Sequence, residues 1–260
     1  MLKGKTALVT GSTSGIGQGI AEALAAAGAN IVLNGFGEAA AIEELQAGIA
    51  ARHGVTVTYD GADMSKPAEI AAMVGEAESA FGAVDILVNN AGIQYVAPIE
   101  EFPAERWDAV IAINLSAAFH ATKAALPAMR GKGWGRVINV ASAHGLSASA
   151  NKSAYVAAKH GIVGLTKVTA LETGGSGITC NAICPGWVLT PLVDQQIRDR
   201  AAESGRSYEE TKLALVAEKT PSKDFSTPEQ IGGLAAFLCS PAADQITGAP
   251  ISIDGGWMAQ

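Results

Sequence analysis

A tyrosine lies between two lysines on a short segment that could carry proton chemistry. In NKSAYVAAKHG, Lys152 precedes Tyr155 by three residues and Lys159 follows it by four. The i, i+4 spacing puts Tyr155 and Lys159 on one face of a helix. A free phenol has a pKa of about 10, and a lysine cation roughly 4 Å away contributes about 4 kcal/mol at an effective dielectric of about 20. We therefore expect Lys159 to lower the pKa of Tyr155 by roughly 3 units at most, which would prepare the phenol for proton transfer.

A glycine-rich segment near the start of the chain has the pattern of a phosphate-binding loop. TGSTSGIGQG follows a strand-like run, opens a helix, and spaces Gly11, Gly15 and Gly17 as GxxxGxG. Glycine allows the tight turn and the close approach of a pyrophosphate, which the free N–H groups at the helix start then bind. The placement between a strand and a helix predicts a dinucleotide site.

The residues around this loop favour NAD over NADP. The 2′-phosphate of NADP is normally bound by Arg or Lys near the loop or at the end of the second strand. Here that strand is followed by Gly35, Phe36 and Gly37, and the first cation after it is Arg52. The acidic residue typical of NAD sites is also missing unless Glu38 serves. We predict NAD from the missing positive charge.

Short β-branched runs alternate with Ala-rich segments of helical period along the whole chain. This alternation predicts βαβ units and a parallel sheet with ligands at the carboxyl ends of its strands. The expected fold is therefore α/β, a Rossmann-like doubly wound parallel sheet of about seven strands with a helical lid. Strands are expected at 6–10, 30–34, 55–59, 84–89, 136–142, 178–183 and 250–254. Helices are expected at 15–29, 38–53, 67–81, 103–130, 154–173 and 228–240.

The chain is expected to form a single dinucleotide-binding catalytic domain over residues 1–260. The polar, amphipathic segment at about 187–225 is long for a connection, as lids often are. A net charge of -7 and the lack of a basic run argue against a nucleic-acid partner. The three cysteines match no metal pattern, so we expect buried free thiols and no metal site. With no signal peptide and no apolar run near about 18 residues, we expect a cytoplasmic protein without membrane contact.

Several motifs occur together in the order typical of one family. They are TGSTSGIG, NNAG (89–92), Asn114, Ser142, YVAAK (155–159) and PGWVLTP (185–191). In this combination the chain resembles the short-chain dehydrogenase/reductase family over essentially its whole length. The resemblance implies hydride transfer to a nicotinamide with Tyr155 as acid or base, Ser142 holding the substrate oxygen, and Asn114 helping to hold a water that links Lys159 to solvent. It also implies a homotetramer.

The resemblance assigns cofactor contacts by motif. Asp63 is similar to the adenine-contacting acid, although it could instead cap the following helix. Asn90 is expected beside the ribose, and Val188 and Thr190 beside the carboxamide and pyrophosphate. The full expected cofactor set is Gly11, Thr13, Ser14, Gly15, Ile16, Gly17, Phe36, Asp63, Met64, Asn90, Gly92, Tyr155, Lys159, Pro185, Val188 and Thr190.

Local residues point to a small acid as substrate. His144 and Lys152 lie in the loop between Ser142 and Tyr155, Gln94 follows the fourth strand, and the lid offers Gln195 and Gln196. If these converge they form a cationic, amide-rich pocket for a carboxylate, with Trp187 over a methyl group. The combination is similar to family members that oxidise (R)-3-hydroxybutyrate to acetoacetate with NAD, and it implies Gln94, His144, Lys152 and Gln196 as the carboxylate-binding set. Trp257, near the C-terminus, is expected to be a packing or oligomer residue.

Two alternatives remain beside this reading. A 3-ketoacyl carrier-protein reductase, or another short-chain alcohol dehydrogenase, shares the fold and the catalytic set. The missing cation after the second strand argues against the NADPH-dependent reductase, as do Lys152, His144 and Gln94 in a pocket. A non-catalytic nucleotide-binding regulator usually has a damaged Tyr–Lys pair, whereas Tyr155 and Lys159 are both intact.

Overall fold

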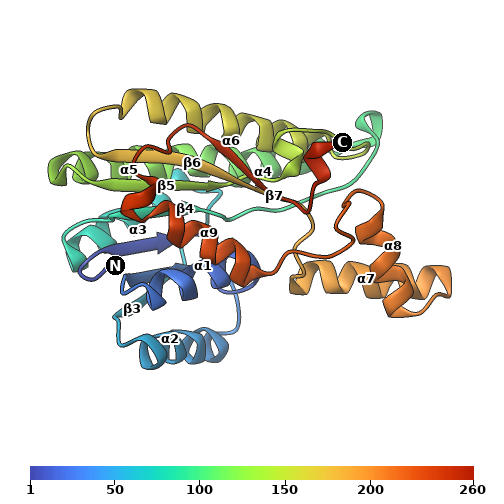
Figure 1. The fold of residues 1–260 in the computed structure, drawn as a ribbon, viewed down its shortest axis with the longest axis horizontal. Helices are drawn as coiled ribbons and strands as arrows, with labels where there is room; N and C mark the ends of the chain where they lie inside the picture. The colour runs from blue at the N-terminus through green and yellow to red at the C-terminus, as the bar shows by residue number, and fades with distance from the viewer.

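Seven parallel strands form one sheet in the computed structural model, which describes residues 1–260 except for the side chain of Leu192 (Figure 1). Their order across the sheet is β3-β2-β1-β4-β5-β6-β7. The predicted fold class is confirmed, and each predicted strand end lies within two residues of the observed one. The strands are β1 (Thr6–Val9), β2 (Asn30–Asn34), β3 (Val57–Asp60), β4 (Ile86–Asn89), β5 (Gly135–Val140), β6 (Ile178–Pro185) and β7 (Pro250–Ile253).

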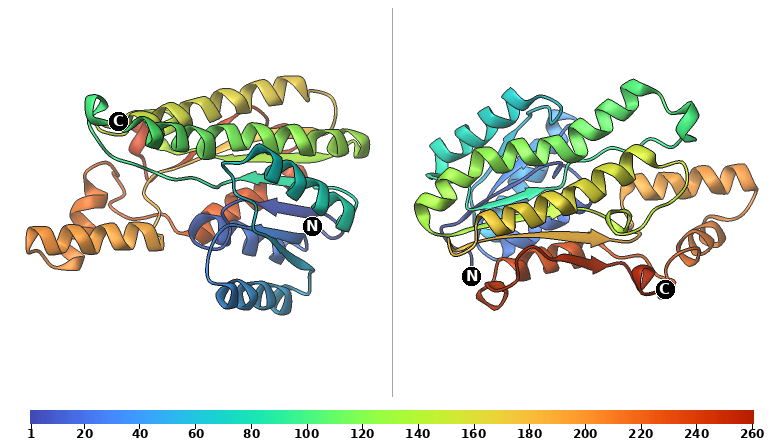
Figure 2. Two further views of the ribbon diagram at one scale, coloured as in Figure 1. Left: turned by 180° about the vertical axis from the view of Figure 1, so that it is seen from behind. Right: turned by 90° about the horizontal axis from the view of Figure 1, so that it is seen from above.

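Helices cover both faces of the sheet because its strands are apolar on both sides. Along β1, Val9 joins a core with α1 and α9, whereas Leu8 joins a separate core with α3 and α5. Alternate side chains of a strand point to opposite faces, so a strand that is apolar throughout needs two covers. One cover is α1 (Gly15–Ala26), α2 (Ala39–His53) and α9 (Pro228–Leu238); the other is α3 (Pro67–Phe81), α5 (Ala117–Lys132) and α6 (Ser153–Glu172) (Figure 2).

The strand order reverses between β1 and β4, which leaves an opening at their carboxyl ends. Thr10, just after β1, accepts hydrogen bonds at its Oγ1 from the N–H groups of Asn90 (2.9 Å) and Ala91 (3.0 Å), just after β4. Asn90 Nδ2 also donates to the carbonyls of Thr10 and Gly11 at 2.8 and 2.9 Å. Ligands of doubly wound sheets bind at such a reversal point.

A π-helical turn interrupts the long helix that the sequence predicts over 103–130. The segment Ala112–Ser116 is π-helical and joins α4 (Ala104–Ile111) to α5. A π turn holds one residue more than an α-helical turn, and the spacing of apolar residues in the sequence does not reveal it. Single π turns often occur at functional sites, and this one carries Asn114.

The combined helix Ala104–Lys132 is apolar over much of its length, although polar and charged residues such as Asn114, His120 and Lys123 interrupt it. By length and composition it could cross a membrane, with a window of mean hydropathy 1.3. Its small apolar residues Ala117, Ala121 and Ala125 are buried in the core beside the sheet. Packing on the sheet therefore accounts for part of this apolar composition.

Two helices after β6 project beyond the sheet, within the segment at about 187–225 where a lid is predicted (Figure 1). α7 (Pro191–Ser204) begins at Thr190, whose Oγ1 accepts a hydrogen bond from the N–H of Val193. α8 (Tyr208–Ala217) packs beside it, and Tyr208 donates a 2.5 Å hydrogen bond to Asp194 of α7. The two helices thus share their own small core.

Candidate active site

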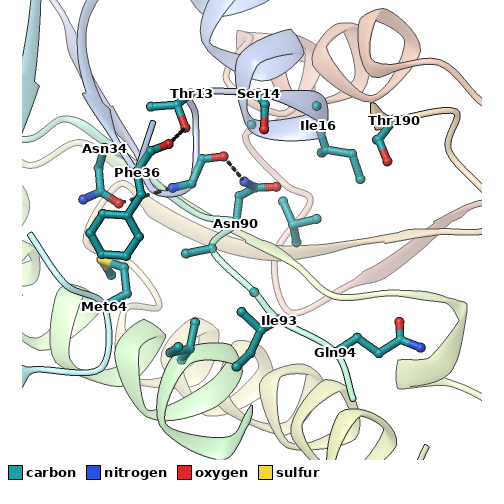
Figure 3. Close-up of a pocket in the computed structure, with 18 of the residues that line it drawn as sticks. Thr13, Ser14, Ile16, Asn34, Phe36, Met64, Asn90, Ile93, Gln94 and Thr190 are labelled. Atoms are coloured by element: carbon teal, nitrogen blue, oxygen red, sulfur yellow. Dashed lines mark hydrogen bonds between the residues drawn. The ribbon is translucent and has the colours of Figure 1, made fainter. Parts of the chain in front are cut away.

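A cavity of about 400 Å³ opens at the carboxyl ends of β1 and β4, beside the start of α1 (Figure 3). Ser14 is the N-cap residue of α1, yet its side chain makes no capping hydrogen bond. The first N–H groups of a helix need an outside acceptor, which an anion can supply. A Cβ on Gly17 would lie 2.3 Å from the Gly11 carbonyl oxygen, and Gly15 has a φ of +57°. This cradle fits the pyrophosphate of a dinucleotide.

One end of this cavity is built around Asn34, the last residue of β2. Its Oδ1 accepts from the N–H of Gly11 at 3.2 Å, and its Nδ2 donates to the carbonyls of Asp60 and Ala62. Thr13 Oγ1 donates to the Phe36 carbonyl at 2.9 Å. The phosphate loop and the end of β2 are thereby held together by hydrogen bonds within the protein.

The Phe36 ring, 71% exposed, lies near Met64 at the end of the cavity opposite Gln94 and Thr190 (Figure 3). The neighbouring Asp63 carboxylate accepts from the N–H and hydroxyl of Ser65 at 2.9 and 2.8 Å, and these hydrogen bonds lower its pKa. Asp63 orders the turn before α3 and also lines the cavity. It is not the cap of that helix, because Lys66 holds the N-cap position.

Tyr155 and Lys159 of α6 both line the cavity, with Lys159 Nζ 5.6 Å from the centroid of the tyrosine ring. Lys159 Nζ donates to the Val140 carbonyl at 2.7 Å, and burial lowers its pKa to about 8. Burial raises the pKa of Tyr155, and the Ser142 hydroxyl partly offsets this rise. The expected lowering of the tyrosine pKa by a lysine about 4 Å away is therefore not found here. The ammonium is directed at a carbonyl instead of the phenol.

Asn114 acts on the loop after β4. Its Oδ1 accepts from the N–H of Ile93 at 2.8 Å, and its Nδ2 donates to the Ile93 carbonyl at 3.0 Å. This paired contact fixes the backbone immediately before Gln94. Asn114 is itself buried and does not line the 400 Å³ cavity.

A second cavity of about 170 Å³ adjoins the first, and four residues line both: Ile16, Gln94, Tyr155 and Thr190. Pockets for drug-sized ligands are typically about 300–1,000 Å³, so this one suits a small molecule. Trp187 and Trp257 line it with ring centroids 6.4 Å apart. Lys152 Nζ lies 5.7 Å from the Trp187 ring, and Gln196 reaches the same cavity from α7.

The two basic residues of this cavity differ in charge. Burial, and then the positive charge of Lys152, lower the pKa of His144 to about 4, so its imidazole is neutral at neutral pH. Burial, and then the charge of Arg200, lower the pKa of Lys152. A carboxylate that entered the cavity would relieve that cost, because an opposite charge favours the ammonium form.

Comparison with known proteins of similar sequence and structure identifies the family to which the chain belongs. Residues 11–258 match the family model described as "Enoyl-(Acyl carrier protein) reductase". A protein named D-beta-hydroxybutyrate dehydrogenase from Cupriavidus necator is 65% identical over 262 residues, with 100% of each chain covered. One of the same name from Rhizobium meliloti is 56% identical over 98% of this chain and 99% of that protein. The chain belongs to the short-chain dehydrogenase/reductase family.

Solved structures agree with this family. L-sorbose reductase from Gluconobacter frateurii, complexed with NADPH and L-sorbose, aligns with a TM-score of 0.95 and 31% identity over 100% of this chain and 98% of that one. A protein from Agrobacterium tumefaciens described as a putative 2-deoxy-d-gluconate 3-dehydrogenase with bound NADP has a TM-score of 0.86 and 37% identity, with the same coverage.

The structure gathers most of the family's expected residues around the two adjoining cavities. Ser142, Gln94, His144, Lys152, Trp187 and Gln196 line the smaller one, together with Val188. Three expected residues are placed elsewhere. Pro185 is buried at the end of β6 and lines neither cavity, and Asn114 stands behind the cavity wall. Gln195 is exposed and donates to Asp199 at 2.8 Å, one helical position away from the side that faces the cavity.

Sequence reasoning missed Trp257 as a member of the family site. Its ring packs edge-on against His144 with centroids 5.2 Å apart. Asp254 holds the turn that delivers it, because the carboxylate accepts from the N–H groups of Gly256 (3.0 Å) and Met258 (2.9 Å). The signal available in the sequence was the DGG before this tryptophan, since Asp and Gly mark a tight turn.

Proposed function

We propose that this protein oxidises (R)-3-hydroxybutyrate to acetoacetate with NAD and catalyses the reverse reduction. The observation that carries the proposal is the small cavity beside Tyr155, into which one ammonium, one neutral imidazole and two amides converge. Carboxylates are bound by charge-assisted hydrogen bonds from such donors. The names of the two dehydrogenase relatives support the same substrate.

The chain's own residues divide the reaction between proton handling and substrate orientation. The bound nicotinamide would accept the hydride from C3 of the substrate. The Ser142 hydroxyl holds the C3 oxygen, and Tyr155, which must first lose its own phenolic proton, takes the hydroxyl proton as that oxygen becomes a carbonyl. Lys159, with a pKa of about 8, is suited to pass the proton onward at neutral to mildly alkaline pH. Gln94, His144, Lys152 and Gln196 hold the carboxylate, so that C3 is presented to the cofactor side of the cavity.

The names of the two dehydrogenase relatives point to the (R) isomer, because D-beta-hydroxybutyrate is (R)-3-hydroxybutyrate, and the small cavity favours a short chain. Tyr155, Trp187 and Trp257 line the small cavity, and the two tryptophans are apolar surfaces suited to the methyl group. Reversing the configuration at C3 would exchange hydrogen and hydroxyl, and the hydrogen would no longer face the nicotinamide if the carboxylate stayed on Lys152. Catalysis requires the reacting atoms to be aligned, so we expect little turnover of the (S) isomer.

A panel of substrates tests this reaction. Steady-state rates would be measured with (R)- and (S)-3-hydroxybutyrate, a neutral secondary alcohol of similar size and a 3-ketoacyl carrier-protein substrate. We expect the highest kcat/KM for (R)-3-hydroxybutyrate. Turnover of the acyl carrier substrate without turnover of any short 3-hydroxy acid would overturn the proposal in favour of the carrier-protein reductase.

NAD is the proposed cofactor because the cavity offers no cation for a 2′-phosphate. Among the residues described as lining it, the one Lys or Arg is Lys159, which lies beside Tyr155. The Phe36→Arg variant would add a cation after β2, at an exposed position whose side chain is not part of the core. Calorimetric titration should show NAD bound more tightly than NADP by the native protein, and a gain in NADP affinity in the variant. Tighter NADP binding by the native protein would refute this assignment.

We further propose a homotetramer in the cytoplasm. The family resemblance implies the tetramer, and α5 and α6 expose Phe119, Val168 and Leu171 by 47%, 51% and 83%. Contiguous exposed apolar groups mark interaction surfaces. Light scattering should give the tetramer mass for the native protein and a smaller species for Leu171→Glu. The buried free thiols of Cys180, Cys184 and Cys239 agree with a reducing compartment.

A further inference from the structure

Ser149 forms a hydrogen bond with His144, a residue that lines the smaller cavity. It lies in the loop between the 3₁₀ turn Ala143–Gly145 and α6, and it is not among the residues that line the small cavity. Its Oγ is 2.9 Å from Nε2 of His144. The other ring nitrogen, Nδ1, has no hydrogen-bond partner among the side chains and backbone that the structure describes, and His144 lines the cavity.

The chemistry of a neutral imidazole makes this contact decisive. Such a ring carries one proton, so one nitrogen donates and the other accepts. A carboxylate only accepts. Because Ser149 occupies Nε2, Nδ1 is the ring nitrogen left for a carboxylate in the cavity that His144 lines. To bind that carboxylate Nδ1 must carry the proton, because an unprotonated nitrogen would place a lone pair against the carboxylate oxygen. Nε2 must then accept a hydrogen bond, and a serine hydroxyl can donate one.

The surroundings keep the two nitrogens from exchanging places. The His144 ring is 5% exposed and meets the rings of Trp257 and Tyr155 edge-on, at 5.2 and 6.0 Å. Its main-chain N–H donates to Ser142 Oγ at 3.1 Å, which fixes the backbone of the same residue. A packed ring with a fixed backbone presents the same nitrogen to the cavity throughout.

We infer that Ser149 is a positioning residue for the acid site: its hydroxyl donates to Nε2 of His144 and thereby keeps the proton on Nδ1, as a donor to the substrate carboxylate. The functional half of this inference rests on the proposed oxidation of a hydroxy acid. The proton position on His144 is a property of the protein alone, so it can be tested separately.

Nitrogen NMR on the full-length protein tests the proton position. The chain has four histidines, so His144→Gln identifies the His144 signals in ¹⁵N-histidine-labelled protein. We expect a neutral ring protonated at Nδ1 in the native protein and in Ser149→Thr, which keeps the hydroxyl. In Ser149→Ala the Nε2-protonated form should gain population. The matched control is Ser147→Ala in the same loop, because Ser147 donates to the Ala143 carbonyl at 3.1 Å and should leave the His144 signals unchanged.

Kinetics tests the consequence for the substrate. A hydrogen bond to a charged group is worth enough that its loss should raise KM for (R)-3-hydroxybutyrate roughly tenfold in Ser149→Ala. The change in kcat should be smaller, and Ser149→Thr should restore KM. Reduction of 4-hydroxybutan-2-one, in which a neutral hydroxymethyl group replaces the carboxylate of acetoacetate, should show a smaller rise in KM than reduction of acetoacetate does.

Three results would overturn the inference. They are a native His144 protonated at Nε2, a Ser149→Ala spectrum identical to the native one, and equal losses in KM on acetoacetate and the neutral ketone. If the native protein turned over no short 3-hydroxy acid, the proposed function would fail. The NMR comparison would still decide whether Ser149 sets the proton on His144.

Discussion

The neutral state of His144 makes a prediction about stability that is independent of any substrate. Its folded pKa is about 4, against 6.5 for the unperturbed group. Because the folded pKa of this base is lowered, the unfolded chain takes up a proton before the folded protein does. The contribution of the neutral His144 to the free energy of unfolding is fully present above about pH 6.5, and it is lost as the pH falls toward about 4.

The size of the loss follows from the two pKa values. Near pH 5 the unfolded imidazole is almost fully protonated and the folded one is almost fully neutral. The free energy of unfolding should then be lower than near pH 7 by about 2 kcal/mol from this residue alone. Solvent screens the charge on this imidazole only weakly, because His144 is only 5% exposed.

Urea denaturation of the native protein and of His144→Gln, near pH 7 and near pH 5, measures this term. The native protein should lose about 2 kcal/mol more than the variant between the two pH values. His120→Gln is the control, because His120 lies on α5 and lines neither cavity. Equal acid losses in the native protein and His144→Gln would refute the reasoning that burial keeps this histidine neutral.

Three further substitutions test separate parts of the site. Lys152→Met should lower kcat/KM for (R)-3-hydroxybutyrate roughly tenfold to a hundredfold, and lower it far less for a neutral ketone, since only the acid loses a charge-assisted hydrogen bond; equal losses in a steady-state assay would contradict that role. In Lys159→Arg, the rise in the rate of oxidation with pH near 8 should disappear from the pH–rate profile, because arginine does not deprotonate. Gly17→Ala should abolish NAD binding in a calorimetric titration, since its Cβ would meet the Gly11 carbonyl at 2.3 Å, whereas Gly233→Ala, with no atom within 4 Å of the new Cβ, should bind normally.

Regular patterns made most of the fold predictable from the sequence. Apolar runs gave the strands because a doubly covered sheet needs them, and the helix over 67–81 matches α3 (Pro67–Phe81) residue for residue. The glycine-rich loop and the YVAAK segment carry their function in local spacing. Residues of both segments line the larger of the two adjoining cavities.

Contacts between segments that lie far apart along the chain could not be predicted from the sequence. The partner of Lys159 is the carbonyl of Val140, and no spacing rule reveals which oxygen a buried ammonium will meet. Gln196 faces the cavity and Gln195 does not, because the phase of α7 depends on where Thr190 starts the helix. Trp257 reaches the site because β7 and the turn after it return the chain to the cavity.

The most direct test of the account is the reaction itself. Purified protein would be mixed with NAD and (R)-3-hydroxybutyrate, with formation of NADH followed by absorbance and the organic product identified by mass spectrometry. The account predicts one acetoacetate for each NADH, with much slower formation from the (S) isomer and with NADP in place of NAD. Absence of acetoacetate, or faster turnover with NADP, would contradict it.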